Sequence, residues 1–216
     1  MEKLKPNDQM AKNAIIFIWI VLILEVVSFI SSYLQYDLLQ TVANGGYISP
    51  EAADANDNRE QTIYVIYLIA FIISAITFIV WFRRAYYNLH QKVDSLLYSE
   101  GWAAGSWFIP IINLYRPYKI MKELYVKTKE LLEKRGFLAQ VNYTTSYVGW
   151  WWSIWIIKGF ISNFMYRYSL KADTVNEYIA LTVAGMIFSI LNILCALITV
   201  KIIKDYSKVE SLLKEV

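Results

Sequence analysis

The apolar residues of this chain fall in four long blocks that are separated by polar segments. The blocks cover about residues 14–34, 62–82, 148–166 and 178–202 and contain few charged residues. A bilayer core of about 30 Å is crossed by about 20 helical residues, because each residue advances the helix by about 1.5 Å. A helix on a soluble protein would keep one polar face along its length, and these blocks have none. The pattern predicts an all-α membrane protein with four transmembrane helices.

The segments that follow the first and third blocks are polar. Residues 35–61 contain the turn formers Asn44, Gly45 and Gly46, and we expect a loop here with one short helix that begins at Ser49 or Pro50. Residues 167–177 are too short for more than a tight connector. Neither segment has the size or the apolar content of a folded domain.

The composition excludes several other classes of protein. Hydrophobic residues make up 57% of the chain and charged residues 18%, against about 45–50% and about 25% in average globular proteins. The 8 Gly, 4 Pro and single cysteine exclude a fibrous or low-complexity chain and a disulfide scaffold. The first block is longer than the apolar region of a cleaved signal peptide and no small-residue cleavage site follows it, so we expect it to be retained.

Lysine and arginine are distributed unequally between the two sides of the predicted membrane. The N-terminal segment, the segment between the second and third blocks and the C-terminal segment hold 17 of them, and the other two connections hold three. Because cytoplasmic loops carry the excess of positive charge, both termini and the long middle loop should be cytoplasmic. The net charge of +3 is thus a signal of topology, and we expect no nucleic acid partner.

Residues 101–136 of the middle loop should associate with the membrane. Residues 101–115 are apolar but too short to span, which leaves a re-entrant segment, an interfacial segment or one packed against the bundle. Pro110 and Gly105 predict that this segment is broken or kinked.

An amphipathic helix should follow, begun by Pro117 and ended by Gly136. It should lie on the membrane surface or pack under the bundle. Its apolar stripe consists of Tyr118, Met121, Leu124, Tyr125, Thr128, Leu131 and Leu132.

Two stretches on the cytoplasmic side carry a recognisable pattern. It reads W-x-x-R-A-x-x-N and then G-W-x-x-G-x-W-F-x-P-x-x-N-L-x-x-P, and the matching residues are Trp81, Arg84, Ala85, Asn88, Gly101, Trp102, Gly105, Trp107, Phe108, Pro110, Asn113, Leu114 and Pro117. The pair resembles a bacterial multi-pass family described as domain of unknown function 4328. The resemblance implies a bacterial multi-pass protein with helical spans over roughly residues 14–203, and it implies no activity. With the predicted topology, we expect the protein in the bacterial inner membrane.

Two charged residues lie inside the predicted spans. Glu25 is 11 steps into the first block and Lys158 is 10 steps into the third, which puts both about 15–17 Å deep, near the bilayer midplane. An unpaired charge there is costly, so such residues are usually paired or functional. Three interpretations remain: a structural ion pair, a proton- or ion-coupled site, or a shifted third span that lets Lys158 reach the interface.

A second group of candidate residues lies at the cytoplasmic interface. It consists of Arg83, Arg84, Asn88, Asn113 and Arg116, beside Trp81, Trp102 and Trp107. Arginine offers a planar fork to oxyanions, so the group could bind an anionic lipid headgroup or a phosphate. The alternative is ordinary interfacial anchoring, with the two asparagines capping broken helix ends.

Two further patterns are weaker. Gly101 and Gly105 have the small-xxx-small spacing of closely approaching helices. Four tryptophans at the start of the third block read as the inner aromatic belt of that span, and they are Trp150, Trp151, Trp152 and Trp155.

The sequence contains no catalytic signature. Nucleophile-elbow, zinc-protease, phosphate-loop and dinucleotide motifs are missing, and one histidine, His90, with one cysteine predicts neither a metal site nor a cofactor. We therefore expect a non-enzymatic membrane or interaction component, with a membrane protein partner or a homo-oligomer. The alternative is a small transporter or channel that uses Glu25 and Lys158, and the third hypothesis is a lipid-headgroup-binding or lipid-modifying protein.

Overall fold

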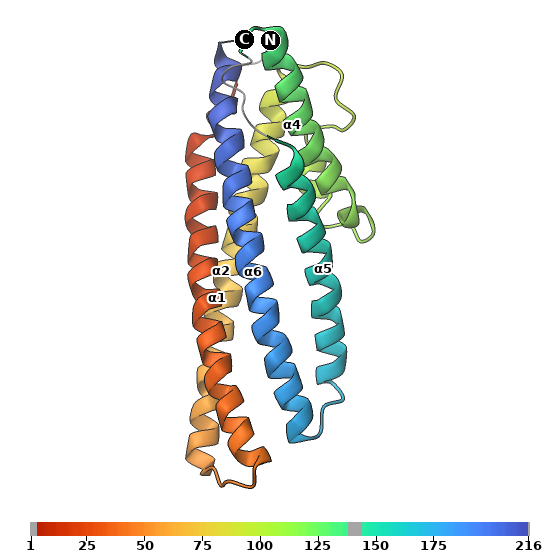
Figure 1. Ribbon diagram of the computed structural model, residues 1–216. Helices are drawn as coiled ribbons and strands as arrows, with labels where there is room; N and C mark the ends of the chain where they lie inside the picture. Colours follow the sequence, from red (N-terminus) through yellow and green to blue (C-terminus); the bar gives the residue numbers. More distant parts are fainter. Residues whose placement is uncertain (1–3, 138–143, 216) are drawn as a thin grey trace. The chain divides into compact units, whose positions relative to one another are not determined.

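The described part of the protein is built from helices alone. The computed structural model describes residues 4–137 and 144–215, and no strand occurs among them. The elements are α1 Asp8–Ala43, α2 Pro50–His90, α3 Trp102–Gly105, the 3₁₀ helix η1 Ile112–Leu114, α4 Arg116–Lys134, α5 Ser146–Ser169, α6 Val175–Glu210 and the 3₁₀ helix η3 Ser211–Lys214 (Figure 1). The predicted all-α fold is confirmed. Three helices, α1, α2 and α6 with its 3₁₀ extension, are long and apolar enough to cross a membrane.

The long helices extend well beyond the apolar blocks. The helix start predicted at Ser49 or Pro50 is confirmed, because α2 begins at Pro50. The prediction was wrong on two points: α1 continues to Ala43, and the expected short helix runs without a break into the second apolar block. Apolar blocks mark the length that a bilayer requires, whereas a helix continues into polar residues when these find partners. Here Arg59 of α2 donates from Nε to the Ser31 hydroxyl of α1 at 2.9 Å. The predicted tight connector is confirmed, since α5 ends at Ser169 and α6 begins at Val175.

The chain divides into two compact units. We call residues 1–18, 73–153 and 198–216 the motif unit, because both motif stretches lie in it, and residues 19–72 and 154–197 the Glu25 unit. The four long helices α1, α2, α5 and α6 each contribute residues to both units. The two units sort their side chains in different ways and are described separately below.

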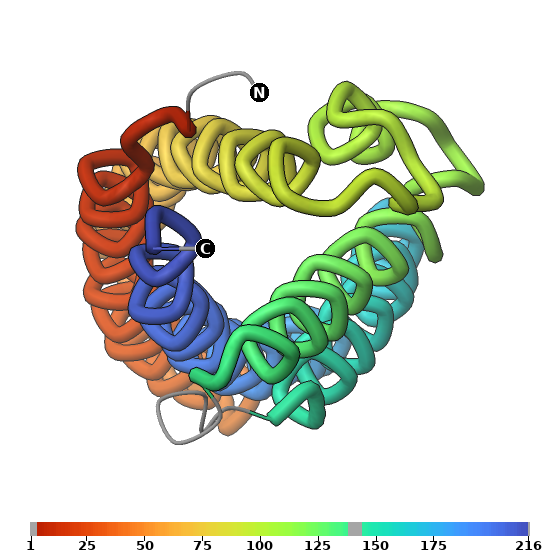
Figure 2. Tube along the Cα trace, turned by 90° about the horizontal axis from the view of Figure 1, so that it is seen from above, coloured from red at the N-terminus to blue at the C-terminus, as the bar shows by residue number. Residues whose placement is uncertain are grey.

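The motif unit has a large aromatic and aliphatic core. The largest fully buried side chains come from α2, α4 and α6, and they are Trp81, Phe82, Tyr86, Leu89, Ile120, Met121, Leu124, Tyr125, Leu132, Ile202, Ile203 and Tyr206. The hydroxyl of Tyr125 donates to the carbonyl of Ile202 at 2.7 Å, and the ring of Tyr206 meets Trp81 edge-on at 6.2 Å. Figure 2 looks onto this end of the helices. The core therefore ties α4 to both α2 and α6.

The helix predicted after Pro117 is confirmed with nearly the expected limits. It is α4, Pro117 stands in its first turn, and Gly136 follows it with a φ of +86°. The predicted stripe differs at four positions: Tyr118 and Leu131 are half-exposed, while Ile120 and Glu123 are buried. A stripe read from hydropathy cannot include Glu123, because its carboxylate is buried by specific hydrogen bonds rather than by its apolar character.

The segment of residues 101–115 is broken, as predicted. It contains the four-residue α3, a turn and η1. The close helix approach expected from the spacing of Gly101 and Gly105 is wrong, because a Cβ built at either glycine meets no atom within 4 Å. Both residues lie at the ends of α3, a helix too short to present a packing face.

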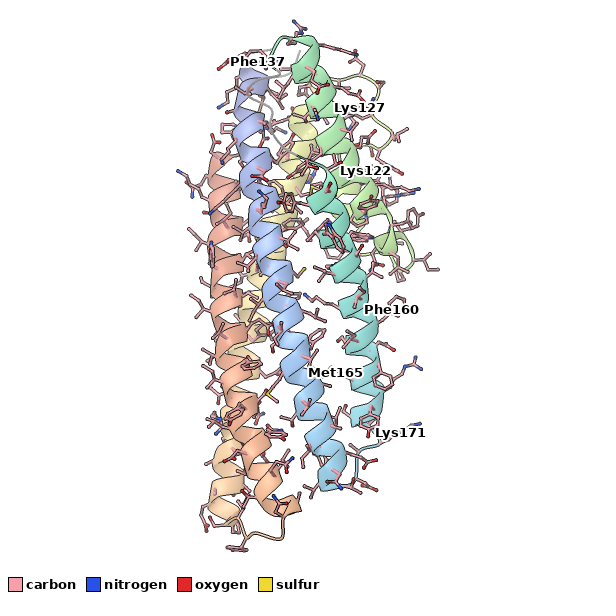
Figure 3. All side chains as sticks on the ribbon, viewed as in Figure 1. Lys122, Lys127, Phe137, Phe160, Met165 and Lys171 are labelled. Carbon is pink, nitrogen blue, oxygen red and sulfur yellow. The ribbon has the colours of Figure 1, made fainter. Side chains whose placement is uncertain are left out.

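The Glu25 unit lacks a comparable apolar core in the part of the chain that the structure describes. Its buried apolar side chains among the described residues are Val21, Ala70 and Cys195. Its helices instead expose large apolar side chains, including Ile23, Ile30, Ile66, Ile69, Phe160, Phe164, Ile187 and Ile190. Phe160, labelled in Figure 3, is 71% exposed. Polar side chains lie inside, and these are Glu25, Ser31, Asn56, Thr182, Ser189 and Asn192.

Candidate functional site

Glu25 occupies the interior of the Glu25 unit. Its side chain, on α1, is only 3% exposed. The carboxylate accepts hydrogen bonds from Tyr67 of α2 and from Ser189 and Asn192 of α6, and Lys158 of α5 attracts it electrostatically. All four helices of this unit therefore contribute to the surroundings of one carboxylate.

Glu25 and Lys158 attract each other electrostatically without a direct ion pair among the described contacts. Among the described residues, the ion pairs with an N–O distance within 4 Å do not include these two. Lys158 is half-buried, whereas Glu25 is buried. The direct partners of Glu25 are thus neutral donors, and their hydrogen bonds let a carboxyl group lie inside an apolar structure.

Sequence reasoning found the two charged members of this cluster and missed the three neutral ones. A charge interrupts an apolar block visibly, but tyrosine, serine and asparagine are ordinary residues in such blocks. The only available signal was spacing: Ser189 and Asn192 stand three residues apart on α6, so they share a helix face.

Arg83 and Arg84 line a shallow cavity on the motif unit. Arg83 Nη2 lies 3.1 Å from Glu100 Oε1, and Arg84 Nη1 donates to the carbonyl of Pro6 at 2.9 Å. The ammonium of Lys5 stands 3.6 Å from the centre of the Tyr87 ring. The cavity has a volume of about 220 Å³ and is lined by Lys5, Val80, Arg83, Arg84, Tyr87 and Glu100. Three cations and one carboxylate give it a net positive charge.

Arg116 belongs to a different place. Its guanidinium lies 4.0 Å from the Trp102 ring and 5.3 Å from the Tyr98 ring. The Tyr98 carbonyl is held by the Tyr86 hydroxyl at 3.1 Å and by His90 Nε2 at 2.9 Å. An arginine on two aromatic faces is fixed in position by cation–π attraction. The lining of the cavity beside Arg84 does not include Arg116, so the predicted arginine group is divided.

Glu123 holds the loop that carries Tyr98. The Tyr86 hydroxyl donates to Glu123 Oε2 at 2.6 Å, and the backbone N–H of Leu97 donates to Oε1 at 2.8 Å. This buried carboxylate therefore joins α2, α4 and the connecting loop. Neither Glu123 nor Tyr86 was predicted, because a buried acid in a surface-like helix has no signature in hydropathy.

Asn88 closes a network that we call the Asn88 clasp, made of Lys5, Asn7, Trp81, Asn88 and Glu210. Asn88 Oδ1 accepts from the Lys5 N–H at 2.8 Å, and Asn88 Nδ2 donates to Glu210 Oε1 at 2.7 Å. Asn7 Nδ2 donates to Glu210 Oε2 at 3.0 Å and to the Trp81 carbonyl at 3.3 Å. The interpretation that Asn88 caps a helix end is therefore wrong. Asn88 fastens the segment before α1 to the ends of α2 and α6.

Trp107 and two of the predicted belt tryptophans form an aromatic cluster in the motif unit. Trp107 meets Phe78 at 5.8 Å and Trp151 at 6.2 Å between ring centres. Trp152 donates from Nε1 to the Leu114 carbonyl at 3.1 Å. The belt prediction is wrong for Trp151 and Trp152, which are buried, whereas Trp150 is exposed. Buried aromatic rings here hold the loop of residues 107–115 against α5.

The loop of residues 107–115, which we call the apolar finger, contains a strained turn. Ile111 has a φ of +69° and a ψ of −49°, and the Ile112 N–H donates to the Pro110 carbonyl at 2.8 Å. These are the features of a γ-turn with positive φ, a rare conformation that is costly for a β-branched residue. Phe108 and Ile111 are both 74% exposed. Strain is thus maintained in a loop that displays large apolar side chains.

The remaining motif residues shape the backbone around this finger. Pro110 is exposed and Asn113 half-exposed, while Pro117 is buried in the first turn of α4. Neither η1 nor α4 has a side-chain cap at its start, so the capping role expected for Asn113 is also wrong. The residues described by the structure include no group of three His, Cys, Asp or Glu side chains that could hold a metal ion.

The comparisons with known proteins identify a family but no activity. Residues 44–208 match the family described as Domain of unknown function (DUF4328). The match contains both motif stretches and Lys158 but starts after Glu25, later than the expected limit near residue 14. Neither the curated proteins nor the solved structures include a match. Because the match covers most of the chain and includes the motif residues, the protein belongs to the DUF4328 family.

Proposed function

We propose that the protein is a four-span component of the bacterial inner membrane, with α1, α2, α5 and α6 as spans and both termini cytoplasmic. The observation that carries this proposal is the inverted sorting of the Glu25 unit, which exposes isoleucine and phenylalanine and buries Glu25, Ser189 and Asn192. Contiguous exposed apolar surface of this extent is not stable in water. Lipid tails are the solvent that such a surface requires, and polar groups in lipid must find partners inside the protein.

Hydropathy does not place α5, the third of these spans in chain order, among the helices that are long and apolar enough to cross a membrane. Its 24 residues correspond to about 36 Å of helix, more than the hydrocarbon core needs. It exposes Ile157, Phe160 and Phe164 on its outer faces. Tryptophan and tyrosine lower the hydropathy of a helix without making it unsuited to lipid, because they favour the interface.

The apolar finger supports an interfacial position for residues 101–115. Its contact residue Trp107 packs on Phe78, which lies near the cytoplasmic end of the predicted second span. Phe108, Ile109 and Ile111 are exposed at the tip. An exposed apolar loop at this level would insert into the headgroup and acyl boundary of the inner leaflet.

Within the membrane, the protein acts as a non-enzymatic interaction component. The motif residues Trp81, Asn88 and Trp107 hold the motif unit together. They build a rigid platform that presents the apolar finger and the cationic cavity. A platform of this kind binds a partner or a second copy of the chain.

Purification in mild detergent tests the role. Affinity capture of the full chain, followed by light scattering during gel filtration, should yield a stoichiometric partner or a homo-oligomer. A monodisperse monomer from the same membranes would count against the proposal.

The topology has its own test: single cysteines placed at residue 47 and residue 130 in a Cys195→Ser background should be labelled from the outside and from the inside, respectively.

A second candidate function is that of a small transporter or channel, and the burial of Glu25 among Tyr67, Ser189 and Asn192 favours it. A carboxylate that can exchange protons near the midplane is typical of coupled transport. In liposomes, Glu25→Gln should abolish ion or proton flux and leave the fold intact, as judged by gel filtration. Lys158→Met, which removes only the distant charge, should reduce flux less. Equal flux in all three proteins would exclude this function.

A further inference from the structure

We propose that Lys5, Arg83 and Arg84 bind the phosphodiester headgroup of an anionic glycerophospholipid whose acyl chain lies along α2. The inference rests on the proposed membrane topology, which places this end of α2 at the cytoplasmic interface. It assigns a ligand class to the cavity described above.

The first support is the register of α2. Ile73, Ile76, Val80, Arg83 and Tyr87 are spaced by three and four residues in turn, so they lie on one face of the helix. The three apolar members of this row are exposed. One continuous face thus changes from apolar to cationic between Val80 and Arg83, at the predicted end of the second span. A phospholipid has the same order of groups along its length.

The second support is the hydrogen-bonding capacity that remains at the cavity. A guanidinium offers five N–H donors. Among the described contacts, Arg83 uses one nitrogen for Glu100 and Arg84 uses one for the Pro6 carbonyl. These contacts fix the orientation of both forks and leave further donors for an oxyanion. Arginine forks match phosphate oxygens in pairs, which a lysine alone does not do.

The third support comes from the other lining residues. The Lys5 ammonium is held over the Tyr87 ring at 3.6 Å, so a third positive charge is already in place beside the two arginines. Glu100 is the one acid in the lining, and Arg83 neutralises it at 3.1 Å. The local field therefore favours a monoanion or dianion.

The size of the cavity favours a lipid over a soluble phosphate compound. At about 220 Å³ the cavity is smaller than the roughly 300–1,000 Å³ typical of sites that enclose a small molecule. It can hold a phosphate group but not a nucleotide. The rest of the ligand must lie outside, and the adjoining surface on α2 is the apolar row of Ile73, Ile76 and Val80. Anionic lipids are available in the cytoplasmic leaflet.

Native mass spectrometry of the full-length protein tests the site. The protein in mild detergent is mixed with equal amounts of phosphatidylglycerol and phosphatidylcholine, and in a separate arm with excess inorganic phosphate. The wild type should retain phosphatidylglycerol preferentially, and the double variant R83Q/R84Q should lose that preference about tenfold. The matched control K122Q/K134Q removes two exposed cations of α4 (Lys122 is labelled in Figure 3) and should leave retention unchanged.

Two outcomes would overturn the inference. Equal retention of phosphatidylglycerol by the wild type and R83Q/R84Q would do so, as would displacement of the lipid by inorganic phosphate, which would indicate a site for free phosphate. Lys5→Gln removes an exposed cation and Ile76→Ser interrupts the apolar row. These two single variants replace R83Q/R84Q if the double variant does not fold, and each alone should weaken the retention of phosphatidylglycerol. Carbonate extraction separates the hypotheses: a protein that stays in the membrane without lipid preference refutes only the lipid site, and an extracted protein refutes the topology.

Discussion

The motif unit and the Glu25 unit share four helices and both bury polar side chains, but among the described residues only the motif unit also buries a large set of apolar ones. The motif unit buries Trp81, Phe82 and Tyr206 as a water-soluble domain would. The Glu25 unit buries Glu25 and Asn192 and turns its isoleucines outward. The hydrophobic effect can organise the first unit, whereas in lipid it supplies little force between helices, and hydrogen bonds and close packing must act instead. Hydropathy alone, summed along a helix, does not distinguish the two situations.

The largest test of this difference compares two phenylalanines. Phe82→Ala deletes a fully buried ring of the motif unit and should cost about 3–5 kcal/mol of stability. Phe160→Ala deletes an exposed ring of the Glu25 unit and should change stability by less than about 0.5 kcal/mol. Thermal unfolding followed by circular dichroism in detergent measures both. Equal losses would show that the two units are sorted alike.

The next effect concerns the Asn88 clasp. Glu210→Ala removes the acceptor that Asn7 and Asn88 share, so each of these buried amides loses one of its hydrogen bonds, which should cost about 1–3 kcal/mol. Hydrogen exchange should become faster at residues 5–11 and 205–214 and stay unchanged in the Glu25 unit. Glu215→Gln, on an exposed acid nearby, is the control. Exchange that increases throughout the chain would contradict a local clasp.

The same carboxyl makes the motif unit sensitive to pH. Glu210 lies beyond the predicted last span, and burial raises its pKa above the ordinary 4.5; Asp8 acts in the same direction, while Asn88, Asn7 and Lys214 oppose it. The folded protein therefore keeps this proton to a higher pH than the unfolded chain does. The associated stability is fully present below pH 4.5 and is lost as the pH rises through the raised value. Unfolding temperatures should follow this trend in the wild type and be flatter in Glu210→Gln.

The smallest predicted effect lies at the apolar finger. Ile111→Gly replaces a β-branched residue at positive φ and should stabilise the protein by up to about 1 kcal/mol, because strain relief exceeds the backbone entropy of glycine. The same change removes an exposed apolar side chain. The apolar finger should therefore bind lipid more weakly. A spin label at residue 108 of the purified protein measures this as a change in accessibility. A destabilised Ile111→Gly would mean that the turn is not strained.

Local features of the chain were predictable, and contacts between distant segments were not. Pro117 and Gly136 define α4, and Pro110 interrupts the preceding segment, because proline and glycine act on their own backbone. The five residues grouped at the interface separate in the structure because register and tertiary packing decide their neighbours: Arg84 meets Pro6, Asn88 meets Glu210 and Arg116 meets Trp102. No spacing rule relates residues so far apart. The helix start at Pro50 was predicted, but the continuation of α1 to Ala43 and of α2 into the second span was not, because partners such as Ser31 and Arg59 pair across two helices.

The Asn88 clasp also constrains the order in which the protein can be made. Asn7 and Glu210 are 203 positions apart, and the motif unit takes its third segment, residues 198–216, from beyond all the other helices. Contacts of such long range form late, since the intervening chain must first be arranged. During synthesis, Trp81 and the segment before α1 must therefore wait for Tyr206 and Glu210 to emerge. Folding of the motif unit can therefore be completed only after residues of α1, α2 and α6, up to Glu210, have left the ribosome.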